Sequence, residues 1–193
     1  PDWHLIMPDQ RGHGESDRPA SGYTIEHYAS DAIALLKEIG ASSAMVVGHS
    51  LGSAVAQRVA ARHSGRVHRL VLIGAARTFD MPEVSGLQRE VAQLESGPDE
   101  EFIRAFQSST LHAAVPEDFF EQVVAESRKL PLRVWKSAFA ALTDNGDTDP
   151  DQIRCPALII YGEHDAIFPV AHQHLLHEGI ALSRLEILKD TGH

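Results

Sequence analysis

Residues 48–52 read Gly48, His49, Ser50, Leu51 and Gly52, which is the pattern G-x-S-x-G, and they lie between an apolar run and a helical pattern. A serine on a sharp turn from a strand into a helix adopts a strained backbone conformation that exposes its hydroxyl. Glycines are expected on both sides because neighbouring backbone passes too close for a Cβ atom. The pattern predicts that Ser50 is a nucleophile, that the Leu51 N–H donates to an oxyanion, and that His49 shapes the pocket. The alternative is a tight turn that happens to contain a serine.

A serine hydroxyl needs a base to take its proton, and that base needs an acid to orient it. Asp165 lies in a turn directly after an apolar run, and His193 follows the next apolar run. The chain order serine, acid, histidine suits a parallel sheet, in which all three lie beyond the carboxyl ends of strands. We therefore predict Ser50, Asp165 and His193 as a catalytic triad. The alternatives are that Asp165 only forms a turn and that His193 is a terminal residue without a role.

The apolar periodicity predicts the elements that must position these residues. Short buried strands are expected at residues 3–8, 44–47, 69–73, 157–161 and 185–188. Helices are expected at 25–39, 53–63 and 170–178. Strands that alternate with helices predict an α/β fold with a mostly parallel sheet and helices on both faces.

Residues 78–149 interrupt this alternation, since they contain amphipathic helical patterns and no convincing strand. The helices are expected near 84–95, 99–108, 116–129 and 131–142. We predict a helical lid at 78–149, inserted into an α/β core formed by residues 1–77 and 150–193. The aromatic candidates for an acyl or ring pocket are Phe79, Phe102, Phe106, Phe119, Phe120, Trp135 and Phe139.

Composition excludes several other classes of function. The 27 acidic and 17 basic residues give a net charge of -10, which argues against binding to nucleic acid or anionic lipid. No apolar run approaches the ~20 residues that span a bilayer. The single cysteine, Cys155, excludes an intrachain disulfide. We expect no cofactor and no metal: His172, His174 and His177 are interpreted as a solvated helix face, and Asp144 and Asp147 as residues of an Asn-Gly turn.

Several segments together resemble the lid-bearing branch of the α/β-hydrolase superfamily. Residues 9–16 resemble the loop after the fourth strand of that family, and 48–52 its nucleophile elbow. Residues 67–76, 156–165 and 185–193 resemble the sixth, seventh and eighth strands, the last two with the catalytic acid and base. The resemblance implies the family's fold and an activity similar to that of small esterases, enol-lactonases, carbon–carbon bond hydrolases or cofactor-free haloperoxidases. Ser50 argues against haloalkane dehalogenases and epoxide hydrolases, which carry aspartate at the elbow.

The resemblance also implies segments that this sequence does not show: three strands, an oxyanion loop before residue 1 and a helix after residue 193. Loss of one oxyanion donor typically lowers turnover ~10²–10³-fold. The leading expectation is a cytoplasmic serine hydrolase that cleaves a small carboxylic ester or lactone through an acyl-enzyme. The alternative is a non-catalytic or ligand-binding relative. We expect the open sheet position to be closed by a second copy in a homo-oligomer, by a rearranged segment 3–8, or by the rest of a longer polypeptide.

Overall fold

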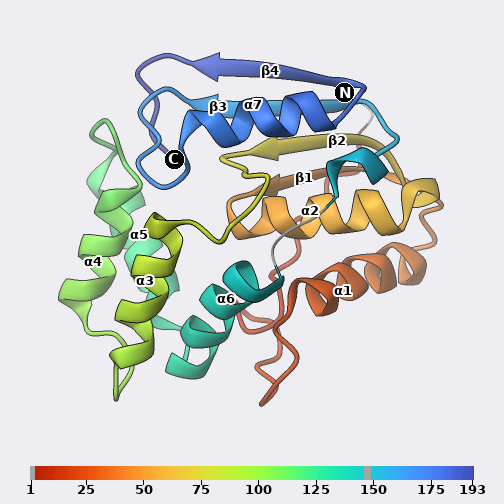
Figure 1. Ribbon diagram of the computed structural model, residues 1–193. Coiled ribbons are helices and arrows are strands. Elements are labelled where there is room, and N and C mark those ends of the chain that lie inside the picture. Colours follow the sequence, from red (N-terminus) through yellow and green to blue (C-terminus); the bar gives the residue numbers. More distant parts are fainter. Residues whose placement is uncertain (1–2, 146–148) are drawn as a thin grey trace.

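A parallel sheet forms the centre of the computed structural model, which describes residues 3–145 and 149–193 (Figure 1). Its strands are β1 (Ala44–His49), β2 (Val67–Ile73), β3 (Ala157–Gly162) and β4 (Ser183–Leu188), in the order β1-β2-β3-β4. All neighbouring pairs are parallel, with Val47 opposite Val71 and Ile160 opposite Glu186. The carboxyl ends of the strands therefore meet at one edge of the sheet, and the predicted α/β class is confirmed.

Three helices outside the segment between β2 and β3 contribute to the core: one precedes β1, one connects β1 to β2, and one connects β3 to β4. The helix α1 (Ile25–Glu38) is capped by Thr24, whose side chain accepts from the His27 N–H. The helices α2 (Leu51–Arg62) and α7 (Val170–Gly179) pack on the same face of the sheet, α2 against β1 and β2, and α7 against β3 and β4 (Figure 1). Alternate strand residues such as Leu70, Leu72 and Ile159 are buried beneath them. This alternation is typical of a sheet with one face in the core.

Residues 3–8 do not form the predicted strand. Their backbone pairs with no described strand, and Trp3, Leu5 and Met7 are 64 %, 74 % and 82 % exposed. A strand is defined by hydrogen bonds to a neighbouring strand, so an apolar pattern alone does not produce one. The following loop is ordered by its own bonds: Asp9 accepts from the Glu15 N–H through Oδ2 at 2.9 Å and from the Ser16 hydroxyl through its carbonyl at 2.7 Å.

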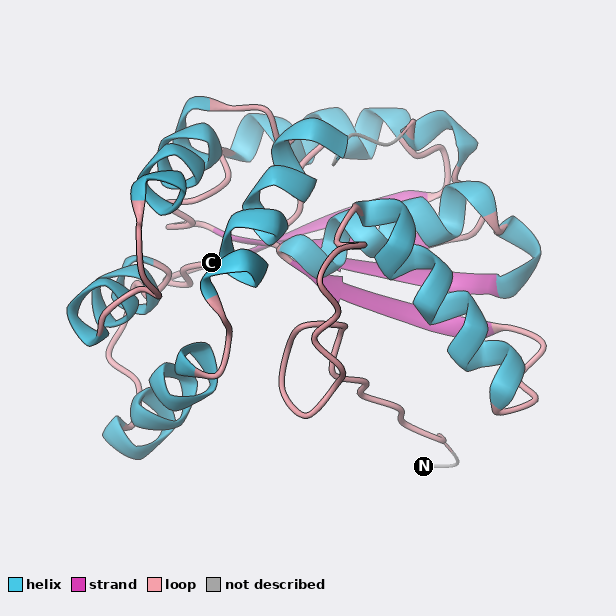
Figure 2. Ribbon diagram, turned by 90° about the horizontal axis from the view of Figure 1, so that it is seen from below, coloured by secondary structure: helices cyan, strands magenta, loops and turns pink. Residues whose placement is uncertain are grey.

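Helices occupy the segment between β2 and β3, and the described residues of this segment form no strand. They are α3 (Pro82–Gln93), α4 (Glu100–Ser109), α5 (Glu117–Arg128) and α6 (Leu132–Asn145). Pro82 begins α3, and the Asp99 side chain caps α4 by accepting from the Phe102 N–H at 2.8 Å. Figures 1 and 2 show α3 to α5 beyond the carboxyl ends of the strands. Asp144 lies in the last turn of α6 and not in a turn after it, because the helix continues to Asn145, and Asp147 lies outside the described residues.

This segment has a hydrophobic core of its own, formed by Val91, Ile103, Val124 and Trp135. Val134, Ala141 and Leu142 of α6 pack instead into the main core. The segment is therefore joined to the sheet domain both through α6 and through its first residues, since Phe79, Met81 and Val84 also pack into the main core. No described helix is long and apolar enough to cross a membrane.

Candidate active site

Ser50 occupies the turn between β1 and α2 with φ 52° and ψ -121°, a conformation that non-glycine residues rarely adopt. Two backbone hydrogen bonds hold this turn: the Ser50 N–H donates to the Ile73 carbonyl at 3.1 Å, and the Ser50 carbonyl accepts from the Ser53 N–H at 2.8 Å. Leu51 is the first residue of α2, where backbone N–H groups have no acceptor within the helix. The turn thus places a hydroxyl beside the positive end of a helix dipole.

The two glycines of this turn differ in how much space surrounds them. A Cβ atom on Gly48 would lie 2.1 Å from the Gly52 carbonyl oxygen, so no side chain fits. A Cβ atom on Gly52 would meet nothing closer than the Gln10 side-chain nitrogen at 3.6 Å, which is ordinary contact. The expectation that close backbone requires both glycines holds for Gly48 and is wrong for Gly52. A Cβ atom would fit at Gly52, whose backbone carbonyl is the group that excludes one at Gly48.

Asp165 and His193 form a buried pair beyond β3 and β4. His193 Nδ1 lies 2.8 Å from Asp165 Oδ2, and the two side chains are 4 % and 0 % exposed. The other carboxylate oxygen, Oδ1, accepts the backbone N–H groups of Ile167 at 2.8 Å and Phe168 at 2.9 Å. Both oxygens of the carboxylate therefore accept hydrogen bonds, and the two backbone N–H groups hold it in its orientation toward the imidazole.

Burial opposes the charge of Asp165 and acts to raise its pKa. The hydrogen bond and charge of His193, together with the two backbone N–H groups, outweigh burial, so the pKa lies below its ordinary value. Asp165 is therefore ionised at neutral pH and can only accept, which requires His193 Nδ1 to carry the proton. His193 Nε2 is then the basic nitrogen of the ring.

Ser50 and His193 line the same cavity, which has a volume of about 530 Å³. His193 Nε2 is buried, and no described residue forms a hydrogen bond with it. Ser50 Oγ and His193 Nε2 are thus not hydrogen-bonded to each other. Such bonds are often long without substrate and shorten when the reacting complex forms.

The backbone and ring of His193 are held by neighbours that the sequence did not reveal. The His193 N–H donates to the Thr110 carbonyl at 3.0 Å, and His49 Nε2 lies 2.7 Å from the His193 carbonyl oxygen. The Phe168 ring packs edge-on against the imidazole, with 5.0 Å between centroids. Thr110 follows α4, so the helical segment directly positions this histidine. No local sequence signal identifies Thr110, because its contact depends on how a remote loop packs.

The cavity is lined mainly by apolar side chains of the helical segment. Phe106, Trp135 and Phe139 of the seven aromatic candidates line it. The other four do not: Phe102 and Phe120 pack into the smaller core, Phe79 is fully buried in the main core, and Phe119 is exposed. The sheet domain contributes His49, Leu51 and the loop residues Asp9 and His13.

The histidines of α7 do not come together as metal ligands in the described part of the chain. His177 Nδ1 lies 2.8 Å from the Ser183 hydroxyl, a contact between α7 and the start of β4. His174 is exposed and His172 is half-buried. The free cysteine, Cys155, is buried at the start of β3, and burial raises the pKa of its thiol.

Comparison with known proteins identifies the family of this chain. A family model described as alpha/beta hydrolase fold matches residues 1–193. An uncharacterized protein of Mycobacterium tuberculosis is 28 % identical over 219 residues, and a non-heme haloperoxidase of Rhodococcus erythropolis is 33 % identical over 192 residues. These matches cover 98 % and 88 % of this chain; the chain spans 62 % of the mycobacterial protein and 68 % of the haloperoxidase.

Among solved structures, an esterase from Exiguobacterium antarcticum matches with a TM-score of 0.84 at 27 % identity, covering 96 % of this chain and 72 % of the esterase. The match therefore includes nearly all of this chain. By its sequence and its structure, this chain belongs to the α/β-hydrolase fold family.

Proposed function

We propose that this protein is a serine hydrolase that cleaves a small carboxylic ester or lactone with Ser50, His193 and Asp165. The observation that carries the proposal is the shared cavity, into which the strained turn brings Ser50 and where the basic nitrogen of His193 has no other partner. The esterase and haloperoxidase relatives support a hydrolase of the α/β family. The choice of an ester or lactone as the substrate rests on the proposed pairing of a serine nucleophile with a histidine base, which suits attack on a carbonyl carbon.

In the proposed reaction, Ser50 Oγ attacks the substrate carbonyl carbon while His193 Nε2 takes the hydroxyl proton. The carbonyl oxygen becomes an oxyanion, to which the Leu51 N–H donates at the start of α2. Collapse of the tetrahedral intermediate breaks the bond to the alcohol oxygen, and His193 returns its proton to that oxygen. In a lactone the released alcohol stays attached to the acyl group.

Water completes the cycle by attacking the acyl-enzyme. His193 takes a proton from this water, and the second tetrahedral intermediate collapses to the free acid as the proton returns to Ser50 Oγ. Asp165 stays ionised throughout, because its low pKa and its three donors favour the charged form next to the imidazolium. No metal or organic cofactor takes part in these steps.

The helical segment, residues 78–149, is proposed as the lid of this site. It supplies Phe106, Trp135 and Phe139 to the cavity and the carbonyl of Thr110 to His193. Apolar side chains favour substrates with an aliphatic or aromatic acyl group. Near the same wall the Gln107 amide donates to the Ser127 hydroxyl at 2.9 Å, which leaves polar groups at one side of the cavity.

A non-catalytic, ligand-binding relative is the second candidate function. The observation that favours it is the lack of a hydrogen bond between Ser50 and His193 among the described residues. Stopped-flow hydrolysis of p-nitrophenyl acetate distinguishes the two. A burst of p-nitrophenol with an acetyl group on Ser50, identified by mass spectrometry, supports the hydrolase. Saturable binding of the ester without turnover or adduct contradicts it and supports the binding protein.

A further inference from the structure

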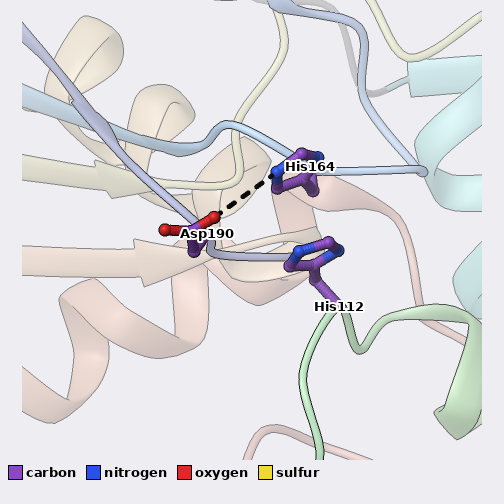
Figure 3. Close-up of side chains that lie close together, drawn as sticks. All are labelled: His112, His164 and Asp190. Atoms are coloured by element: carbon purple, nitrogen blue, oxygen red, sulfur yellow. Dashed lines mark ion pairs between the residues drawn. The ribbon is translucent and has the colours of Figure 1, made fainter.

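Three potential metal ligands from separate loops lie together outside the cavity (Figure 3). His112 lies between α4 and α5, His164 follows β3, and Asp190 follows β4. Their ligand atoms all lie within 4.8 Å of one another, and all three residues are exposed. Two imidazoles and a carboxylate are a donor set that suits Zn²⁺.

The distances between the side-chain nitrogen and oxygen atoms of this cluster suit ligands of one ion and are too long for direct hydrogen bonds. His164 Nε2 lies 4.0 Å from Asp190 Oδ1 and 3.9 Å from Glu163 Oε2. Two ligand atoms that share a Zn²⁺ at ~2.0–2.2 Å each are roughly 3–4 Å apart. His164 Nε2 and the Asp190 carboxylate therefore lie at a separation that an ion could bridge.

The His112 ring stacks on the His164 ring, with centroids 3.8 Å apart and planes 15° apart. Figure 3 shows the Asp190 carboxylate on one side of both rings. Parallel rings do not aim their nitrogen lone pairs at one point, so one ring must turn to coordinate. Both rings are at the surface, and no described residue forms a side-chain hydrogen bond with either of them, so this rotation breaks none.

The backbone beneath the cluster is well fixed. The His164 N–H donates to the Thr191 carbonyl at 2.9 Å. Gly192 packs so closely that a Cβ atom there would lie 2.7 Å from the His112 backbone nitrogen. Asp190 has φ 50°, in the left-handed region, which aspartate and asparagine adopt more readily than most residues. The three ligands thus project from a rigid support while their side chains remain free to adjust.

We propose that His112, His164 and Asp190 bind one Zn²⁺ ion. The ion would join the helical segment, through His112, to the two loops that carry Asp165 and His193. It lies outside the cavity and takes no part in the proposed hydrolysis. Its effect is to stabilise the junction between the helical segment and the sheet domain, because an ion that binds only the folded state raises stability.

Isothermal titration of Zn²⁺ into the protein without a histidine tag tests this proposal. The expected result is one ion per chain and a rise in melting temperature with Zn²⁺. Loss of a group that merely orients a metal ligand weakens affinity about 10–100-fold, so His112→Gln and Asp190→Asn should each weaken Zn²⁺ binding at least that much. Asparagine tolerates the left-handed backbone of Asp190, and glutamine can still lie against the His164 ring.

His174→Ala is the matched control, because it removes an exposed histidine of α7 that lies outside the cluster. This variant should bind Zn²⁺ like the wild type. The melting temperature of each variant without Zn²⁺ separates a folding defect from a loss of binding. Absence of saturable binding in the wild type overturns the proposal, as does equal affinity in the wild type, His112→Gln and Asp190→Asn. Loss of binding in His174→Ala alone would place the ion on α7 and also overturn it.

Discussion

The substitution Asp165→Asn changes the hydrogen bonding of the proposed acid while it keeps the side-chain shape. Oδ1 accepts two backbone N–H groups, from Ile167 and Phe168, so the amide oxygen of asparagine must take that position. The amide NH₂ is then directed at His193 Nδ1, 2.8 Å away in the wild type. Nδ1 has to accept this bond, and the imidazole proton moves to Nε2, where it prevents His193 from acting as a base.

This change of tautomer determines how much of the hydrolysis rate is lost in Asp165→Asn. In a well-studied serine protease the equivalent change lowers kcat ~10⁴-fold. The same loss here corresponds to about 5 kcal/mol of transition-state stabilisation. We expect Asp165→Asn to reduce the initial rate of p-nitrophenyl acetate hydrolysis by about this factor. Circular dichroism should show an unchanged fold, because the shape and the two backbone hydrogen bonds remain and the third bond only reverses its direction.

Asp144→Asn is the matched control, since this aspartate lies exposed at the end of α6. Its rate should stay close to that of the wild type. A large loss in Asp144→Asn with a normal rate in Asp165→Asn would show that the acid is Asp144. Wild-type rates in both variants would refute the argument from the tautomer.

The pKa of Asp165 adds a prediction about stability. Because the folded-state pKa lies below the unfolded value of about 3.9, the carboxylate stabilises the fold fully above that value. This contribution is lost as the pH falls through the folded-state pKa. The difference in free energy of unfolding between the wild type and Asp165→Asn should therefore shrink from about pH 6 to about pH 2. Urea titrations at both pH values measure it, and a constant difference would contradict the assigned shift.

Ser50→Ala should lower hydrolysis ~10⁶-fold. At φ 52° glycine is favoured, so the free energy of unfolding of Ser50→Gly should be about 1 kcal/mol higher than that of Ser50→Ala. Equal urea midpoints of the two variants would contradict strain at this turn. Gly48→Ala should destabilise the fold by ~1–3 kcal/mol and reduce activity, because its Cβ atom would collide with the Gly52 carbonyl, whereas Gly52→Ala should fold normally. Light scattering should detect self-association through the β1 edge, where Met45 and Val47 are exposed; a soluble monomer at all concentrations would exclude it.

Apolar periodicity predicted the helices, whose hydrogen bonds are local in sequence, and the strands whose side chains are buried in the core. The strands at 44–47, 69–73, 157–161 and 185–188 are all present, each extended by one or two residues. Helices form where apolar residues recur at helical spacing, and their ends agree with capping residues such as Thr24 and Asp99. Residues 3–8 have the same apolar composition as the true strands, but no composition can show whether a hydrogen-bonding neighbour is present.

The candidate site was predictable where a motif required its geometry. The elbow pattern requires the positive φ of Ser50, and chain order placed Asp165 and His193 at the ends of neighbouring strands. The Thr110 carbonyl and the cluster of His112, His164 and Asp190 were not predictable, since their contacts join loops that are distant in sequence. Such contacts depend on how the helical segment packs against the sheet domain. Apolar periodicity predicts the helices of this segment but not that packing.

The hydrogen bond from the His193 N–H to the Thr110 carbonyl has a consequence for how substrate preference can change in this chain. The loop that holds the histidine is continuous with α4, whose Phe106 and Gln107 line the cavity. With the proposed function, a substitution that reshapes this wall for a different acyl group should also move Thr110 and tilt the imidazole. Selectivity and rate are therefore not independent traits along α4, and variants selected for a new substrate should need compensating changes at residues 108–112. The wall formed by α6 has no such bond to His193, so a directed-evolution library on Trp135 and Phe139 should broaden selectivity with smaller losses of rate.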